Sequence, residues 1–245
     1  MDILENSKDN KMRISSKKIL YCIVGTGRNG SSLLCSSLYG LGYNFGKTFV
    51  DSWKASSGNY EHPTLHNAYA SLSRSEALKI FPFTNWLSLY FRKKAKLQLS
   101  ELIKTVDCLK SSKLLWLIPL IDKNIEIRMV ILIRDFNEYS FSRYQRFGQT
   151  FAQIERDFIK TYKQLWFYYN THNSIILNFN NFITGFSSEQ TNKLSSFLQA
   201  DKTLLKQKLS ENFDKNYQTK INKKNTESYS HKADNLFLKL NEYAI

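Results

Sequence analysis

Cysteine, proline and glycine are all scarce in this sequence of 245 residues, which holds three cysteines, three prolines and nine glycines. The cysteines, Cys22, Cys35 and Cys108, are odd in number and lack CxxC spacing, which fits a reducing compartment and excludes a disulfide-stapled miniprotein. So little proline and glycine excludes collagen-like and low-complexity chains. With 42% hydrophobic residues, the chain is long enough to bury a core.

Long hydrophobic runs are also absent. The longest stretch of apolar residues spans eight positions, 114–121, whereas a membrane-spanning helix needs about 20. Residues 1–16 are polar and lack the apolar segment of a signal peptide. We therefore expect a flexible tail over 1–16, one domain over 17–245, no transmembrane segment and a cytoplasmic location.

Acidic residues are few: 21 Asp and Glu stand against 35 Lys and Arg, a net charge of +14. Such a charge attracts nucleic acid, an anionic membrane or a ligand with several phosphates, and does not choose among them. The basic run over 92–96 is typical of a solvated helix face, and peripheral contact with a membrane is left open.

Hydrophobic patterning predicts alternating strands and helices. Apolar, β-branched runs over 18–25, 127–135 and 174–179 indicate buried strands. Residues 151–169 carry an apolar stripe at helical spacing, and a capping box of Ser187 and Gln190 begins another helix. The fold class is therefore α/β, with a central, mostly parallel sheet flanked by helices.

A glycine-rich loop over 25–32 connects the first strand to a helix, a unit that typically binds a phosphate at the helix N-terminus. As a Walker A loop it lacks the lysine, because Ser31 stands in that place. As a dinucleotide fingerprint it fits G-x-G-x-x-G, with Asp51 near the position of a ribose-binding acid. A third interpretation rests on the cation inside the loop, Arg28, and on the paired hydroxyls after the last glycine.

This third pattern resembles the 5′-phosphosulfate loop of the bacterial-type sulfotransferases that use 3′-phosphoadenosine 5′-phosphosulfate (PAPS). The residues that match are Gly27, Arg28, Asn29, Gly30, Ser31 and Ser32. A second motif follows the strand over 127–133: Arg134 and Ser142 are similar to the family's 3′-phosphate motif, with Phe136 in place of its proline.

Two further stretches are similar to the same family. Residues 57–63 resemble the segment that carries a catalytic glutamate, which places Glu61 in that role, although the preceding Asn-Pro-Lys is absent. Lys110 and Lys113 stand where the family has Lys-Asp-Pro-Arg.

The resemblance implies a P-loop NTPase-like fold and transfer of a sulfuryl group from PAPS to a hydroxyl acceptor. The acceptor stays open among a saccharide, a glycolipid, a peptide tyrosine and a small phenol, and the resemblance to the bacterial branch favours a saccharide. It implies that residues 27–32 hold the 5′-phosphate, that Arg28 acts at the sulfuryl group, and that Arg134 and Ser142 hold the 3′-phosphate. Glu61 would be the general base. No metal and no specific nucleic acid is expected.

Two other functions stay open. The G-x-G-x-x-G pattern and Asp51 would fit an NAD(P)-dependent oxidoreductase instead. The net positive charge would fit a module that binds polyanions. His62 and His66 are four residues apart, but Pro63 between them favours a helix start over a metal site.

Overall fold

The computed structural model describes residues 17–27, 30–48, 60–80, 82–211 and 230–245. The remaining residues, among them the expected tail, Arg28, Asn29, Asp51 and residues 57–59, lie outside the described residues. No helix in the described part combines the length and the apolar composition needed to cross a membrane.

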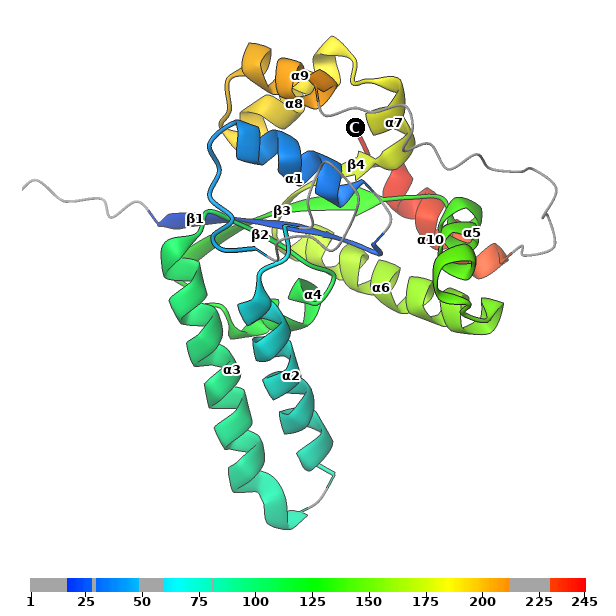
Figure 1. Ribbon diagram of the computed structural model, residues 1–245. Coiled ribbons are helices and arrows are strands. Elements are labelled where there is room, and N and C mark those ends of the chain that lie inside the picture. Colours follow the sequence, from blue (N-terminus) through cyan, green and yellow to red (C-terminus); the bar gives the residue numbers. More distant parts are fainter. Residues whose placement is uncertain (1–16, 28–29, 49–59, 81, 212–229) are drawn as a thin grey trace, which may run out of the picture.

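A four-stranded parallel sheet forms the centre of the molecule (Figure 1). Its spatial order is β2-β1-β3-β4, and each neighbouring pair is parallel. The strands are β1 (Lys18–Gly25), β2 (Cys108–Lys110), β3 (Ile125–Ile133) and β4 (Asn173–Asn178). The predicted α/β class is confirmed.

Helices cover both faces of the sheet, as the unbroken apolar strands require. On one face lie α1 (Ser31–Gly40), α8 (Ser188–Leu198) and α9 (Lys202–Glu211) (Figure 1). The other face carries α4 (Leu114–Leu117), α6 (Phe151–Thr171) and α10 (His231–Asn241), with α5 (Phe136–Phe147) beside them. The short elements are α7 (Phe179–Thr184), η1 (Pro82–Thr84) and η2 (Ile118–Leu120).

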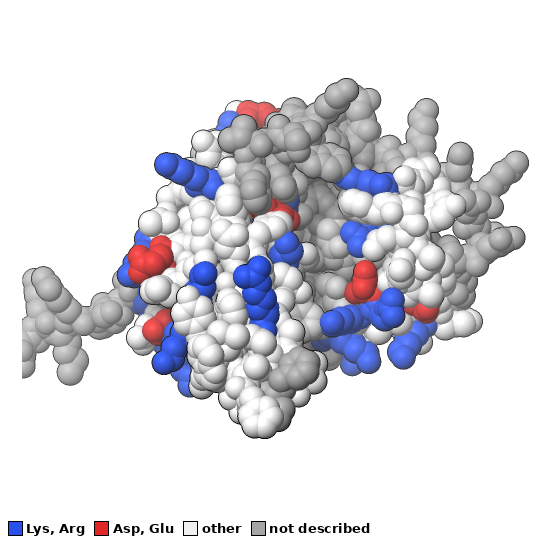
Figure 2. Space-filling view, turned by 60° about the horizontal axis from the view of Figure 1, so that its bottom comes forward, with Lys and Arg blue, Asp and Glu red and all other residues white. Residues whose placement is uncertain are grey.

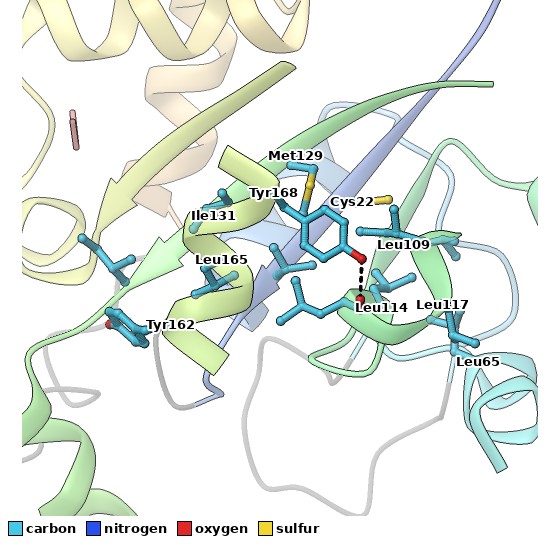
Figure 3. Packing of buried hydrophobic residues seen from close by; sticks show 14 of the residues in the cluster. Cys22, Leu65, Leu109, Leu114, Leu117, Met129, Ile131, Tyr162, Leu165 and Tyr168 are labelled. Carbon is cyan, nitrogen blue, oxygen red and sulfur yellow. Dashed lines mark hydrogen bonds between the residues drawn. The ribbon is translucent and has the colours of Figure 1, made fainter. Parts of the chain in front are cut away.

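Alternation along the strands divides the core into two hydrophobic clusters. In β1, Leu20, Cys22 and Val24 join the cluster with α4 and α6, whereas Tyr21 and Ile23 join the cluster with α1 and α8. Figure 3 shows the first cluster, where the hydroxyl of Tyr168 on α6 donates to the backbone carbonyl of Leu115 on α4. The buried tyrosine thus satisfies its polar atom inside an apolar layer.

A helical hairpin of α2 (Pro63–Leu78) and α3 (Asn85–Thr105) projects from this body (Figure 1). Its base packs into the sheet's core through residues such as Leu65, Leu99 and Leu102. The far end carries η1 and lies away from the sheet. Sequence patterns did not predict this hairpin.

Several predicted elements are confirmed with shifted ends. The strand expected over 127–135 begins at Ile125 and ends at Ile133, so that Arg134 and Asp135 follow it. Both halves of the Ser187–Gln190 capping box are present at α8. The last described residues form α10 and then pair with the outer strand, where Ile245 donates its N–H to the carbonyl of Ile176.

Candidate functional site

The candidate site lies where the parallel strands end. β1 ends at Gly25 and β2 at Lys110, while Arg134 directly follows β3 and Phe179 directly follows β4. The register pairs Ile23 with Lys110 and Gly25 with Leu132, so the glycine loop leaves the sheet between Lys110 and Arg134. Open α/β sheets bind ligands at this edge.

The glycine loop starts α1 through two residues of left-handed backbone. Gly27 and Gly30 both have φ of +79°, and Gly30 is the N-cap residue of α1. No side chain caps this N-terminus. Ser31 and Ser32 form its first turn, so the N–H groups of the helix start, two hydroxyls and the positive end of the helix dipole lie together.

Lys110 brings a positive charge to this helix start. Its side chain is buried, and Nζ donates to Oγ of Ser32 at 2.9 Å. A buried ammonium is stable only with partners that compensate the lost water, and an anion at the loop would be such a partner. The loop therefore lacks the Walker lysine in sequence, but receives a lysine from the adjacent strand.

Arg134 is buried on the other side of the loop. Its Nε donates to Oε2 of Glu138 at 2.9 Å, and its guanidinium lies over the ring of Phe179, 4.3 Å from the centroid. The backbone at Arg134 is fixed by Tyr162, whose hydroxyl both accepts from the N–H and donates to the carbonyl. Arg134 is thus held in place through its backbone, its guanidinium and its stacking surface.

Ser142 lies on α5, one turn beyond Glu138 and on the same face of the helix. It is buried. Asp135 caps α5 by accepting from the N–H groups of Asn137 and Glu138. Phe136, which replaces the family's proline, is a fully buried core residue, so packing and the cap fix this turn where a proline ring would do so in the family.

Glu61 is the first member of a hydrogen-bonded chain of three side chains. Its Oε2 lies 2.9 Å from Nε2 of His66, and Nδ1 of His66 lies 2.7 Å from Nζ of Lys113. An ammonium can only donate, so Nδ1 is the acceptor and Nε2 carries the proton that it donates to Glu61. Lys113 therefore sets the histidine tautomer, and His66 orients the carboxylate.

The segment from Lys110 to Lys113 connects this chain to the glycine loop. Lys110 contacts Ser32 at one end, and Lys113 contacts His66 at the other. The structure thus links Glu61 and the loop, which are 30 residues apart in sequence, through this segment.

Tyr60, directly before Glu61, has strained backbone, with φ of +54°. Its ring packs on Phe45 and Tyr39, with centroid distances of 5.2 and 5.9 Å. Left-handed backbone is costly for a bulky residue and persists only where surrounding contacts impose it. These ring contacts thus fix the direction in which the chain presents Glu61.

The cysteines take no part in the site's chemistry. Burial raises the pKa of the Cys22 and Cys35 thiols to about 12 and also raises that of Cys108. A thiol attacks as its thiolate, and little thiolate forms at neutral pH with such pKa values.

Four residues of the site were missed or left without a role by the sequence analysis. Lys110 and Lys113 were noted without a function, and His66 was considered only as a metal ligand. Phe179 was taken as the last residue of a strand. A histidine five residues after Glu61 was the available signal, but pairing across 47 residues, from His66 to Lys113, leaves no trace in the sequence.

His62 does begin a helix, as predicted, because its Nδ1 accepts from the N–H of Thr64 as the N-cap of α2. Within the described ranges, no group of three or more His, Cys, Asp or Glu side chains is arranged to hold a metal ion. Asp51, the residue of the dinucleotide alternative, lies outside the described residues.

Substitution of Gly30 would test how tightly the loop is packed. A Cβ at Gly30 would lie 2.8 Å from the ring of Phe179, whereas one at Gly27 would meet no described atom within 4 Å. Both Ala variants incur the cost of positive φ, about 1–2 kcal/mol, but only Gly30→Ala adds a clash of about 1–3 kcal/mol. We expect urea titration to show the larger loss for Gly30→Ala. Equal losses would contradict this packing.

Comparison with known proteins supports the fold. The chain matches no protein-family model and no curated protein sequence. Among solved structures it is similar to the sulfotransferase domain of the Synechococcus PCC 7002 olefin synthase, with a TM-score of 0.50 and 13% sequence identity. The similarity covers 93% of this chain and 88% of that one. The molecule therefore has an α/β fold similar to that of this domain.

Proposed function

We propose that this protein is a sulfotransferase that moves a sulfuryl group from PAPS to a hydroxyl of an acceptor. The observation that carries the proposal is the placement of two buried cations, Lys110 and Arg134, on either side of a glycine loop that begins a helix. A donor with phosphates at both the 5′ and the 3′ position of its ribose needs two such anion sites. The fold of a sulfotransferase domain supports the same conclusion.

In this proposal the N–H groups at the start of α1, the hydroxyls of Ser31 and Ser32 and the ammonium of Lys110 bind the 5′-phosphate. Arg28 and Asn29 lie outside the described residues, and the resemblance of the sequence motif assigns them to the same subsite. Arg134 and Ser142 bind the 3′-phosphate and distinguish the donor from nucleotides without it. Burial of both cations strengthens these interactions, since water screens them little.

Glu61 is the proposed general base. It takes the proton of the acceptor hydroxyl as that oxygen bonds to sulfur, and the bond from sulfur to the bridging phosphate oxygen breaks. PAPS supplies the activated sulfuryl group and leaves as adenosine 3′,5′-bisphosphate. His66 orients the carboxylate through its Nε2–H, and Lys113 keeps that proton on Nε2. The residues present provide positive charge for the leaving phosphate without calling on a metal ion.

The dinucleotide alternative is not favoured by the order of elements. Its fingerprint requires an acidic side chain at the end of the strand that follows the loop's helix. In the described part of the chain that strand is β2, which ends in Lys110 and follows α2 and α3. A lysine there attracts a phosphate and does not bind a ribose hydroxyl as a carboxylate does.

The direct test is isothermal titration with adenosine 3′,5′-bisphosphate, with AMP and NAD as parallel ligands. We expect micromolar binding of the bisphosphate, weaker binding of AMP, and no binding of NAD. Preference for NAD would overturn the proposal in favour of the oxidoreductase.

Lys110 offers a more specific test. Lys110→Met keeps the apolar length of the side chain but removes a charge-assisted hydrogen bond, which is worth about 1.5 kcal/mol or roughly tenfold in affinity. Because the 5′-phosphate is common to both ligands, AMP and the bisphosphate should weaken by the same factor. Lys104→Met, at an exposed lysine paired with Glu101, is the matched control and should leave both unchanged. A loss confined to the bisphosphate would place Lys110 at the wrong phosphate.

A further inference from the structure

The end of the α2–α3 hairpin has an unusual distribution of side chains. Its large apolar residues point outward: Phe83 is 92% exposed, Ile80 78% and Trp86 70%. Leu89 and Tyr90 are also exposed, one turn further along α3. We name these five residues the apolar tip.

Small polar residues fill the inside of the same region. Ser75 on α2 and Ser88 on α3 are buried, and their hydroxyls lie 3.1 Å apart. Ser88 also donates to the carbonyl of Ser75 at 3.0 Å. A hairpin that only needed to be soluble would bury its aromatic side chains and expose its serines. This inversion indicates that the apolar tip has a partner.

Basic residues surround the apolar tip. Between residues 74 and 96 the hairpin carries six basic side chains and one acidic one, a net charge of +5. Figure 2, which brings the end of the hairpin forward, shows Lys and Arg beside uncharged surface. The six basic side chains are all exposed: Arg74, Lys79, Arg92, Lys93, Lys94 and Lys96.

We propose that the apolar tip docks on an anionic lipid membrane. Exposed Trp, Tyr and Phe side chains are favourable at the headgroup level, and flanking Lys and Arg bind anionic lipids. The helix α3 has 21 residues and is therefore about 30 Å long, which places the tip well away from the sheet. A second copy of the chain is a poor partner, because it would bring two such positive ends together. This inference does not depend on the proposed reaction.

The test is cosedimentation of the full-length protein with vesicles at about 0.1 M salt. We expect binding to vesicles of phosphatidylcholine with 30% phosphatidylserine and much weaker binding to phosphatidylcholine alone. Phe83→Ser/Trp86→Ser should reduce partition at least tenfold on both vesicle types, since burial of each large apolar side chain is worth roughly tenfold. Lys93→Ala/Lys94→Ala should reduce binding about 25-fold on anionic vesicles only, at about fivefold per charge.

Matched controls lie on α9, at the opposite end of the molecule (Figure 1). Lys202→Ala/Lys206→Ala removes the same charge, and Leu204→Ser removes an apolar side chain that is 40% exposed. Both should bind like the wild type. Absence of anionic-vesicle binding by the wild type, or equal losses in tip and control variants, would overturn the proposal. So would a dimer in solution that Phe83→Ser/Trp86→Ser converts to monomer, because a second copy would then cover the tip.

Discussion

Replacing Glu61 by glutamine is expected to lower the turnover number about 10²–10⁴-fold, the contribution of a positioned general base. The amide has almost the same shape and still accepts from Nε2 of His66, so the fold and the side-chain position should persist. It cannot take the acceptor's proton. Adenosine 3′,5′-bisphosphate should bind the variant as it binds the wild type, because Glu61 belongs to the acceptor side of the reaction.

The measurement is the initial rate of transfer of radiolabelled sulfate from PAPS to an acceptor found by screening saccharides, glycolipids and phenols. Glu101→Gln is the matched control, since Glu101 lies on α3 of the hairpin that follows Glu61, is exposed and pairs with a lysine. It should retain the full rate. If Glu61→Gln is as active as Glu101→Gln, the proton is taken by another group. A variant that loses bisphosphate binding as well would instead assign Glu61 to donor binding.

In the proposed mechanism, His66 positions the Glu61 carboxylate and does not itself take the acceptor's proton. Its role depends on two bonds, to Glu61 and to Lys113, that hold one carboxylate orientation. The sequence could not predict this arrangement, because the partners come from the start of α2 and from the segment after β2. Their meeting follows from the parallel pairing of β1 and β2, which places residue 110 beside residue 23.

Local patterns predicted the parts of the fold that local physics determines. The strands β1, β3 and β4 are continuous apolar runs, and α6 carries its stripe of buried residues, so periodicity alone identified them. Strand β2 has only three residues and escaped detection. It is nevertheless central to the proposed site, because it carries Lys110. The hairpin escaped for a different reason: its end exposes apolar and buries polar side chains, which contradicts the pattern that such predictions use.

The geometry of the site agrees with the motif resemblance in where the residues lie. The resemblance implied that the residues after β1 and after β3 bind one donor, and the register places the ends of these two strands side by side. The role of each residue rests on the proposal. Phe179 shows what the motifs omit, since its ring contacts Arg134 and lies at the position that a Gly30 side chain would need.

Replacing Arg134 by alanine is expected to remove the preference for a 3′-phosphate. In the wild type, the bisphosphate should bind more tightly than AMP by roughly 10- to 150-fold, the worth of one charged hydrogen-bonded contact. In Arg134→Ala the two ligands should bind alike, and AMP should bind as it does to the wild type. This pattern is opposite to that expected for Lys110→Met, which weakens both ligands equally.

A structural side effect must be separated from this loss, because Arg134 also pairs with Glu138, whose side chain is only 18% exposed. Removing the arginine leaves a partly buried carboxylate without this partner, which destabilises the site and repels the 3′-phosphate. The double variant Arg134→Ala/Glu138→Gln removes that charge. If the loss of preference comes from the missing guanidinium, the double variant still binds AMP and the bisphosphate alike. If the preference returns, the repulsion by Glu138 caused the loss, and Arg134 serves the fold while another cation reads the 3′-phosphate.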